Sequence, residues 1–89
     1  MVSIGDFKFN IIEDNKSCFD KEEFESLFTD YFYDYDFIIG DYAYSKLRLK
    51  GFYKDNNKKA KEHNKISNKN NYIENYCAYQ CKYFILEKI

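Results

Sequence analysis

The chain of 89 residues has no proline and no tryptophan, and few glycines or cysteines, three of each; its one arginine, Arg48, stands beside thirteen lysines. The lack of proline, with an apolar fraction of 45%, excludes a collagen-like, linker-like or wholly disordered chain. An odd number of cysteines argues against the paired disulfides of a small secreted domain. We therefore expect a single cytoplasmic domain over residues 1–89.

Long apolar segments are also missing. The longest uninterrupted apolar runs have four residues, at 76–79 and 83–86, whereas a membrane-spanning helix needs about 20. The N-terminal segment MVSIGDFKFN lacks a charged stretch followed by an apolar one, as a secretion signal would have. The sequence thus predicts neither a membrane span nor a secretion signal.

Aromatic residues are abundant, with nine Phe and ten Tyr. A folded chain of this length buries only about 60–65% of the surface that its unfolded form exposes. Large rings bury more area than aliphatic side chains and so compensate for a small core. The excess of Lys, Asn, Ile and Tyr over Arg is typical of AT-rich coding, which lowers the weight of any lysine-rich signal.

Charge is segregated along the chain although the net charge is only −1. Residues 1–45 hold three cations and eleven acids, a net −8, and residues 46–69 hold nine cations and two acids, a net +7. The second segment includes a Lys/Asn-rich stretch at 54–69, which we expect to be a loop or an edge strand.

The first half of the chain predicts one strand and one helix. Apolar residues alternate around residues 4–12, which indicates a strand. Asp20 is a suitable N-cap with Glu23 as its capping-box acid, and this predicts a helix over residues 20–33. The apolar face of that helix repeats at i, i+3, i+4 and i+7, with Phe24, Leu27, Phe28 and Tyr31.

The second half predicts a hairpin, a helix and a closing strand. Strands at 36–42 and 46–53 are joined by a short connection, and residues 58–66 form either a lysine-studded edge strand or a mobile loop. A helix begins near Ser67, and a strand covers 82–87. The order β-α-β-β-(β)-α-β indicates a small α+β two-layer sandwich with a mostly antiparallel sheet of four to five strands and two helices.

A family resemblance rests on the run YDFIIGDYAYSKLRLKGFY, followed by DNNKKA, KIS and YIENYCAYQCKYFILEK. Over about residues 35–88 this order resembles the YutD-like family of small proteins from low-GC Gram-positive bacteria. Tyr42, Ala43 and Ser45 stand where that family tends to have Trp and small residues, although position 42 keeps an aromatic ring. The resemblance implies a cytosolic α+β domain and no particular activity.

The strand at 46–53 suggests a binding surface. Alternation predicts Leu47, Leu49, Gly51 and Tyr53 toward the core and Lys46, Arg48, Lys50 and Phe52 outward. A strand face that combines cations with an aromatic ring resembles modules that bind single-stranded nucleic acid. We therefore expect contact with RNA or a ribonucleoprotein through these four outward residues, extended by Lys54, Lys58 and Lys59. The alternative is a solvated strand beside a lysine-rich loop.

The acidic helix supports a second hypothesis, that the chain is a protein-interaction adaptor whose charge steers a protein partner. Binding by that helix would depend on Glu22 or Glu25 and not on Arg48 or Lys50. Its first-turn acids also have a structural explanation, because the helix dipole favours negative charge there.

Catalytic or metal chemistry has weaker support. Cys77 and Cys81 could share a helix face, and Cys18 with His63 could complete a zinc site. Buried cysteines that act as small apolar residues are the preferred interpretation, so we predict no metal, no cofactor and no enzymatic role, with a thiol- or metal-dependent enzyme as the alternative. Three further acids are expected to be solvated carboxylates at strand ends rather than Mg²⁺ ligands or acid–base groups: Asp34, Asp36 and Asp41.

Overall fold

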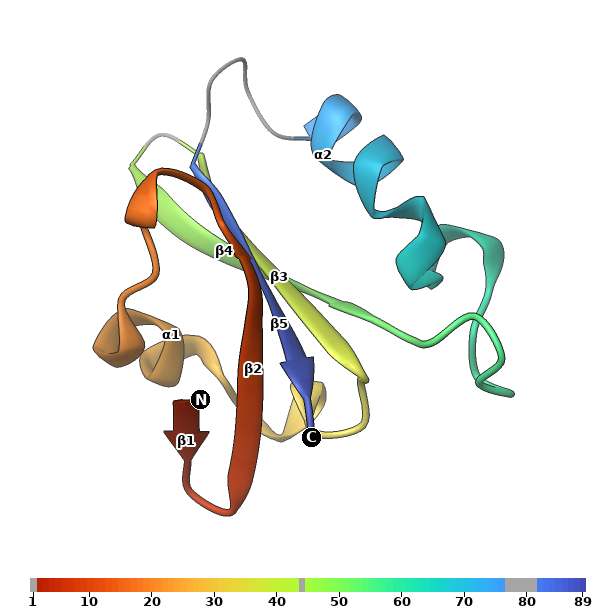
Figure 1. Cartoon of the computed structure of the whole chain (residues 1–89), viewed down its shortest axis with the longest axis horizontal. Helices are drawn as coiled ribbons and strands as arrows, with labels where there is room; N and C mark the ends of the chain where they lie inside the picture. Colours follow the sequence, from red (N-terminus) through yellow and green to blue (C-terminus); the bar gives the residue numbers. More distant parts are fainter. Residues whose placement is uncertain (1, 44, 77–81) are drawn as a thin grey trace.

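The computed structural model describes residues 2–43, 45–76 and 82–89. They form, in chain order, β1 (Val2–Ile4), β2 (Phe7–Asp14), α1 (Lys21–Leu27), β3 (Phe37–Ala43), β4 (Lys46–Phe52), α2 (Lys69–Tyr76) and β5 (Tyr83–Lys88) (Figure 1). The strands make one antiparallel sheet in the order β1-β2-β5-β3-β4. This confirms the predicted α+β class with an antiparallel sheet.

The N-terminal segment is a hairpin, not the single strand expected at 4–12. β1 and β2 pair from Ile4 and Phe7, which flank the two-residue turn of Gly5 and Asp6. Gly5 has φ +56°, a left-handed conformation that costs glycine little. The prediction missed this turn because the apolar alternation begins only after it.

α1 begins as predicted and ends earlier. The Asp20 side chain accepts a hydrogen bond from the Glu23 N–H at 3.2 Å, so this residue is the N-cap. The helix ends at Leu27, because Phe28 has an extended backbone and a short 3-10 helix, Asp30–Phe32, follows. The predicted continuation to residue 33 is wrong.

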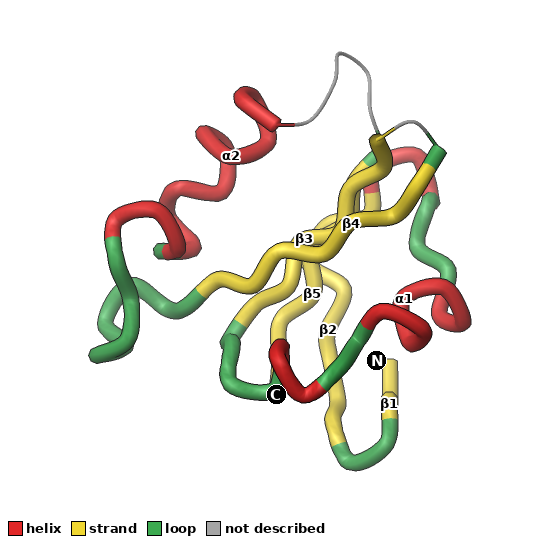
Figure 2. Tube along the Cα trace, turned by 180° about the vertical axis from the view of Figure 1, so that it is seen from behind, coloured by secondary structure: helices red, strands yellow, loops and turns green. Residues whose placement is uncertain are grey.

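Each α-helix covers a different face of the sheet. Phe24 of α1 belongs to a cluster with Ile38 and Phe84, and α2 packs on a second cluster that includes Ile39 and Phe52. Figure 2 shows the two helices on either side of the strands. The layers are therefore helix, sheet and helix rather than the two expected. The reason is that consecutive apolar residues at 37–39 and 84–86 supply both faces of the central strands.

Two glycines allow rings to lie directly on the sheet. A Cβ atom at Gly40 would overlap the Phe84 ring, and one at Gly51 would overlap the Tyr35 ring. The absent side chain at each position is thus a packing requirement.

The connection from β4 to α2 is neither a continuous edge strand nor a simple loop. Tyr53 makes one parallel bridge with Lys65, and short 3-10 helices occupy Glu62–Asn64 and Ile66–Asn68. The side chain of Asn64 is buried and accepts a hydrogen bond from the Lys61 N–H at 2.6 Å. α2 then begins at Lys69. Neither described α-helix has the length and apolar character needed to cross a membrane.

Candidate functional site

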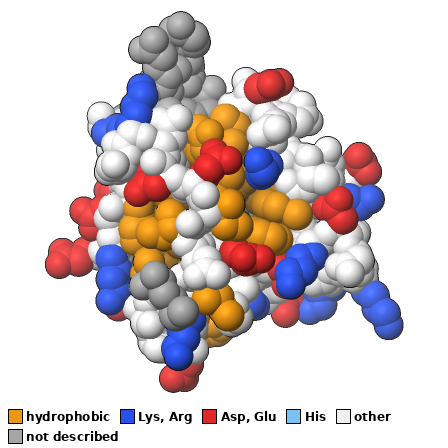
Figure 3. All heavy atoms as spheres, viewed as in Figure 1, with side chains coloured by type: hydrophobic (Ala, Val, Ile, Leu, Met, Phe, Trp, Pro, Cys, Tyr) orange, Lys and Arg blue, Asp and Glu red, His pale blue; other side chains and the backbone are white. Residues whose placement is uncertain are grey.

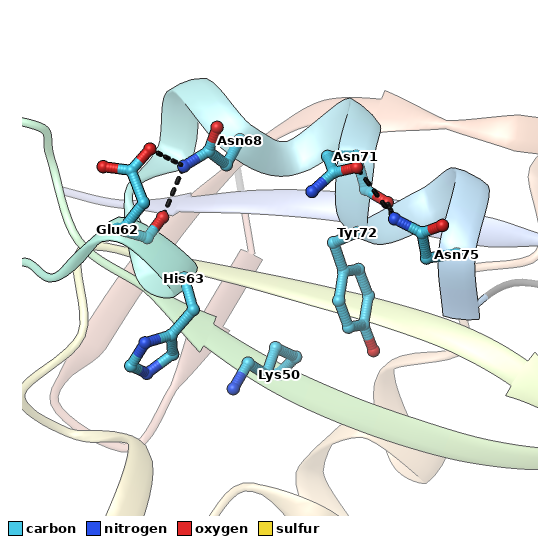
Figure 4. Close-up of a pocket in the computed structure, with 7 residues that line it drawn as sticks. All are labelled: Lys50, Glu62, His63, Asn68, Asn71, Tyr72 and Asn75. Carbon is cyan, nitrogen blue, oxygen red and sulfur yellow. Dashed lines mark hydrogen bonds between the residues drawn. The ribbon is translucent and has the colours of Figure 1, made fainter.

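A groove lies between α2 and β4, with a cavity volume of about 740 Å³. Lys50 lines it from β4, and α2 contributes Asn71, Tyr72 and Asn75 (Figure 4). The preceding 3-10 helices add Glu62, His63 and Asn68. We call this the α2–β4 groove. Its volume falls in the range of known small-molecule and cofactor sites.

Tyr72 forms the wall of the groove that faces the sheet. Its ring meets Phe52 edge to face, with centroids 5.5 Å apart, and its hydroxyl lies 3.5 Å from Oδ1 of Asp41. Asp41 has no exposed surface and accepts a hydrogen bond from Arg48 Nη2 at 2.6 Å. The carboxylate raises the pKa of the Arg48 guanidinium. This pair of a buried carboxylate and a partly exposed guanidinium joins β3 and β4.

Asparagine side chains line the helical side. The Asn75 amide donates to Oδ1 of Asn71 at 2.8 Å and to the Asn71 carbonyl at 2.9 Å. The Asn68 amide donates to the Glu62 carbonyl. Lys65 lies 3.8 Å from the Glu62 carboxylate and offsets its charge. The groove therefore offers amide donors and acceptors. Among the described lining residues, Lys50 carries a charge that no ion pair with a described residue offsets.

The outward face predicted for the 46–53 strand is partly covered. Phe52 is fully buried under α2, so its ring is not on a solvent face as expected. Arg48 is held by Asp41, and Lys50 is half-buried at the groove. Lys46 is exposed. The reason for the difference is that α2 crosses this face of the sheet, which strand alternation alone does not reveal.

The lysine-rich connection lies at the right of the molecule in Figure 1, and blue side chains project from that edge in Figure 3. Lys59 forms an ion pair with Asp34, and each partner moves the other's pKa in the direction that favours the pair. Lys54 and Lys58 are exposed and make no ion pair with a described residue. The basic segment thus keeps part of its charge available.

The three candidate acids have separate structural partners. Asp34 pairs with Lys59, and Asp36 accepts from the Lys54 N–H at 2.8 Å and the Asn57 amide at 3.0 Å. Asp41 was expected to be solvated and is instead buried, because it lies within β3 rather than at the end of that strand.

The thiol and metal candidates do not come together in the described part of the chain. Cys18 packs against the cluster under α1, whereas His63 lines the groove on the other face of the sheet. Burial and the Asp14 charge raise the pKa of the Cys18 thiol, which opposes thiolate formation. Cys77 and Cys81 lie outside the described residues. Within residues 2–43, 45–76 and 82–89, no group of three His, Cys, Asp or Glu side chains could hold a metal ion.

The acidic helix is available on its outer side. Glu22 and Glu25 are exposed, whereas the Glu23 carboxylate accepts a hydrogen bond from the Tyr42 hydroxyl. Burial, followed by that hydrogen bond and the Glu23 charge, raises the pKa of Tyr42. The aromatic ring at position 42 therefore has a structural partner in α1.

Sequence reasoning did not assign the groove. Asn68, Asn71, Tyr72 and Asn75 recur at i, i+3, i+4 and i+7, so the spacing that marks one helix face was present. A helix was predicted to begin near Ser67, and no role was assigned to its polar residues. The polar members of the same face could have indicated a lined groove.

Comparison with known proteins identifies the family. The model of the family described as "Putative antitoxin YutD-like" matches residues 3–87. A Bacillus subtilis (strain 168) protein named "Putative antitoxin YutD" is 40% identical over 89 residues, which is all of this chain and 98% of the relative. The solution NMR structure of B. subtilis YutD matches with a TM-score of 0.82 at 40% identity and covers all of this chain and 81% of that one. The chain belongs to the YutD-like family.

Proposed function

We propose that this protein is a non-catalytic binding module that holds an extended segment of a protein partner in the α2–β4 groove. The observation that carries the proposal is the position of the groove, which lies between α2 and β4 at Lys50, and β4 is an edge strand of the sheet. Grooves between a helix and an edge strand are a recurring place for extended peptides, which use main-chain hydrogen bonds for affinity and side-chain pockets for specificity.

The lining chemistry favours binding over catalysis. Three Asn, one Tyr, one Lys, one Glu and one His surround the cavity, and the described lining contains no Ser, Thr or Cys nucleophile. Amide groups of Asn can both donate and accept, which suits a peptide backbone. We place this activity in the cytoplasm, because three cysteines, an odd number, argue against the paired disulfides of a small secreted domain.

The name of the B. subtilis relative supports the same class. "Putative antitoxin YutD" describes a protein that counters a toxin, and such a role requires a partner. We therefore extend to this chain a partner-binding role.

Site-specific photocrosslinking in cells tests the proposal. A photoreactive residue at Asn71 samples the groove, and the same residue at Glu22 samples the exposed side of α1. We expect a protein crosslink from Asn71 that maps to one short segment of its partner and is lost with Lys50→Glu. Crosslinks from Glu22 alone would contradict the proposal and favour an adaptor that uses the acidic helix.

RNA contact is the second candidate, and the exposed basic residues Lys46, Lys54 and Lys58 favour it. Lys50 could join them, whereas Arg48 and Lys59 are ion-paired and Phe52 is buried. This candidate predicts a nuclease-sensitive crosslink and an RNA affinity that falls steeply with salt. It also predicts loss of that affinity when Lys54 and Lys58 are both changed to Glu.

A further inference from the structure

The outer edge of β4 carries backbone groups whose direction can be deduced from the residue that follows the strand. The Tyr53 N–H donates to the Asn64 carbonyl at 2.8 Å, and the Tyr53 carbonyl accepts from the Ile66 N–H at 2.9 Å. Both partners lie on the side away from β3. Phe52, by contrast, accepts through its carbonyl from the Asp36 N–H on the β3 side, at 3.0 Å.

Backbone direction alternates along a strand, so residues two, four and six before Tyr53 share its orientation. Leu47, Leu49 and Gly51 therefore direct their N–H and C=O groups to the outer edge. No described residue pairs with β4 on that side before Tyr53. The chain itself contributes one bridge at Tyr53 and then turns away at Ile66 toward α2.

The side chains of β4 determine which residue types a strand added at this edge would contact. Lys46 and Lys50 lie on the α2 face of β4, and neither makes an ion pair with a described residue. Leu47 and Leu49 point to the opposite face and pack against the cluster under α1. A neighbouring strand would therefore meet cations on one face and apolar side chains on the other.

We infer that β4 accepts an acidic, extended segment of the partner protein as a sixth strand, in which Asp or Glu alternates with β-branched apolar residues. This inference rests on the proposed function and specifies its occupant. The open edge extends from Leu47 to Gly51. An added strand of about five residues would cover it, because both strands advance by about 3.3 Å per residue.

A second copy of the chain fits this edge poorly. Pairing of β4 with β4 would bring Lys46, Arg48 and Lys50 of both copies together on one face, and like charges across a strand pair are destabilising. Lysines on an edge strand also discourage uncontrolled strand pairing. The same positive charges favour an acidic segment. We therefore expect this edge to repel the β4 edge of a second copy and to attract the acidic segment of the partner.

Titration of the ¹⁵N-labelled full chain with a synthetic peptide of alternating Glu and Val tests the inference. A peptide of alternating Lys and Val is the matched control. We expect the Glu/Val peptide to slow amide hydrogen exchange at Leu47, Leu49 and Gly51 by at least about tenfold, because these N–H groups become hydrogen-bonded. The Lys/Val peptide should leave them unchanged.

Charge reversal checks the role of the lysines. Lys46→Glu and Lys50→Glu should each weaken binding of the Glu/Val peptide by about three- to fivefold, which is the range of exposed charge pairs. Lys8→Glu, an exposed lysine on β2, should not change it. Unchanged exchange at Leu47, Leu49 and Gly51 overturns the inference. If the amide NMR signal of Asn71 nevertheless shifts, strand addition is contradicted but binding in the groove is not. The photocrosslink at Asn71 tests binding in the groove independently.

Discussion

Asp41 shows how single residues link the sheet to α2. Its carboxylate has no exposed surface and depends on Arg48, whose side chain is 46% exposed, and more distantly on the Tyr72 hydroxyl. If its cationic partner is removed, a buried carboxylate still bears the free-energy cost of desolvation, and the favourable interaction that offset this cost is lost. Arg48 is therefore a structural residue of the groove wall before it is a candidate for ligand contact.

We predict that Arg48→Met lowers the free energy of unfolding by about 1–3 kcal/mol, because it leaves the Asp41 carboxylate without its cation. Lys46→Met on the same strand face is the control and should change it by less than about 0.5 kcal/mol. Urea unfolding at pH 7 measures both. Equal effects of the two substitutions would contradict the assigned role of the pair.

Tyr42 gives a prediction for alkaline pH. Its pKa is raised above the ordinary value of 10.0, so the folded state holds the phenol proton more tightly than the unfolded state does. The stabilisation is complete below about pH 10 and is lost as the pH rises through the folded pKa. Tyr42→Phe removes the hydroxyl and should cost about 1 kcal/mol at pH 8.

The measurement compares unfolding of the wild type and Tyr42→Phe at pH 8 and pH 11. The difference between them should shrink at pH 11, because the unfolded wild type ionises Tyr42 there and part of the stabilisation from the raised pKa is lost. A difference that stays constant across this range would show that the hydroxyl does not contribute in the way the Glu23 contact indicates.

At the scale of elements, α1 depends on its first turn. The helix has seven residues, and Asp20 satisfies one of its free N–H groups. We predict that Asp20→Ala lowers the free energy of unfolding by about 1 kcal/mol, whereas Asp20→Asn, which keeps an accepting side chain, costs much less. Thermal unfolding of the two variants checks this, and equal losses would rule out a capping role.

Local signals in the sequence predicted most elements and failed where tertiary contacts decide. The hairpin of β3 and β4 followed from an apolar run in the first strand, apolar alternation in the second and the short connection between them, and the Asp20 cap followed from residue type and spacing. The end of α1 did not, because Phe28 leaves the helix and packs on Phe24 with centroids 5.4 Å apart. The burial of Phe52 also could not be predicted, since it requires α2 to lie over β4.

The candidate site was predicted in part. Lys50 was singled out for its position on an outward strand face, and it does line the groove. His63 was considered only as a metal ligand. The Asn residues of α2 were not selected because Asn is frequent throughout this chain, so composition gave them no distinction.

At the scale of the whole molecule, the acidic first half of the sequence and the basic segment at 46–69 are joined by ion pairs. Lys59 reaches Asp34 and Lys69 reaches Glu13, so basic residues of the second half partly neutralise acids of the first. Lys46, Lys50, Lys54 and Lys58 keep their charge outside such pairs. The remaining field is thus concentrated beside β4 and the connection that follows it, where an acidic partner would approach.

The central claim is that β4 presents an unpaired outer edge beside the α2–β4 groove. Amide hydrogen exchange along β4 in the free protein tests it most directly. The account predicts alternation: Leu47, Leu49 and Gly51 exchange at least about tenfold faster than Arg48, Lys50 and Phe52, whose N–H groups face β3. Uniform protection along the strand would mean that the outer edge is already paired, and it would contradict the claim.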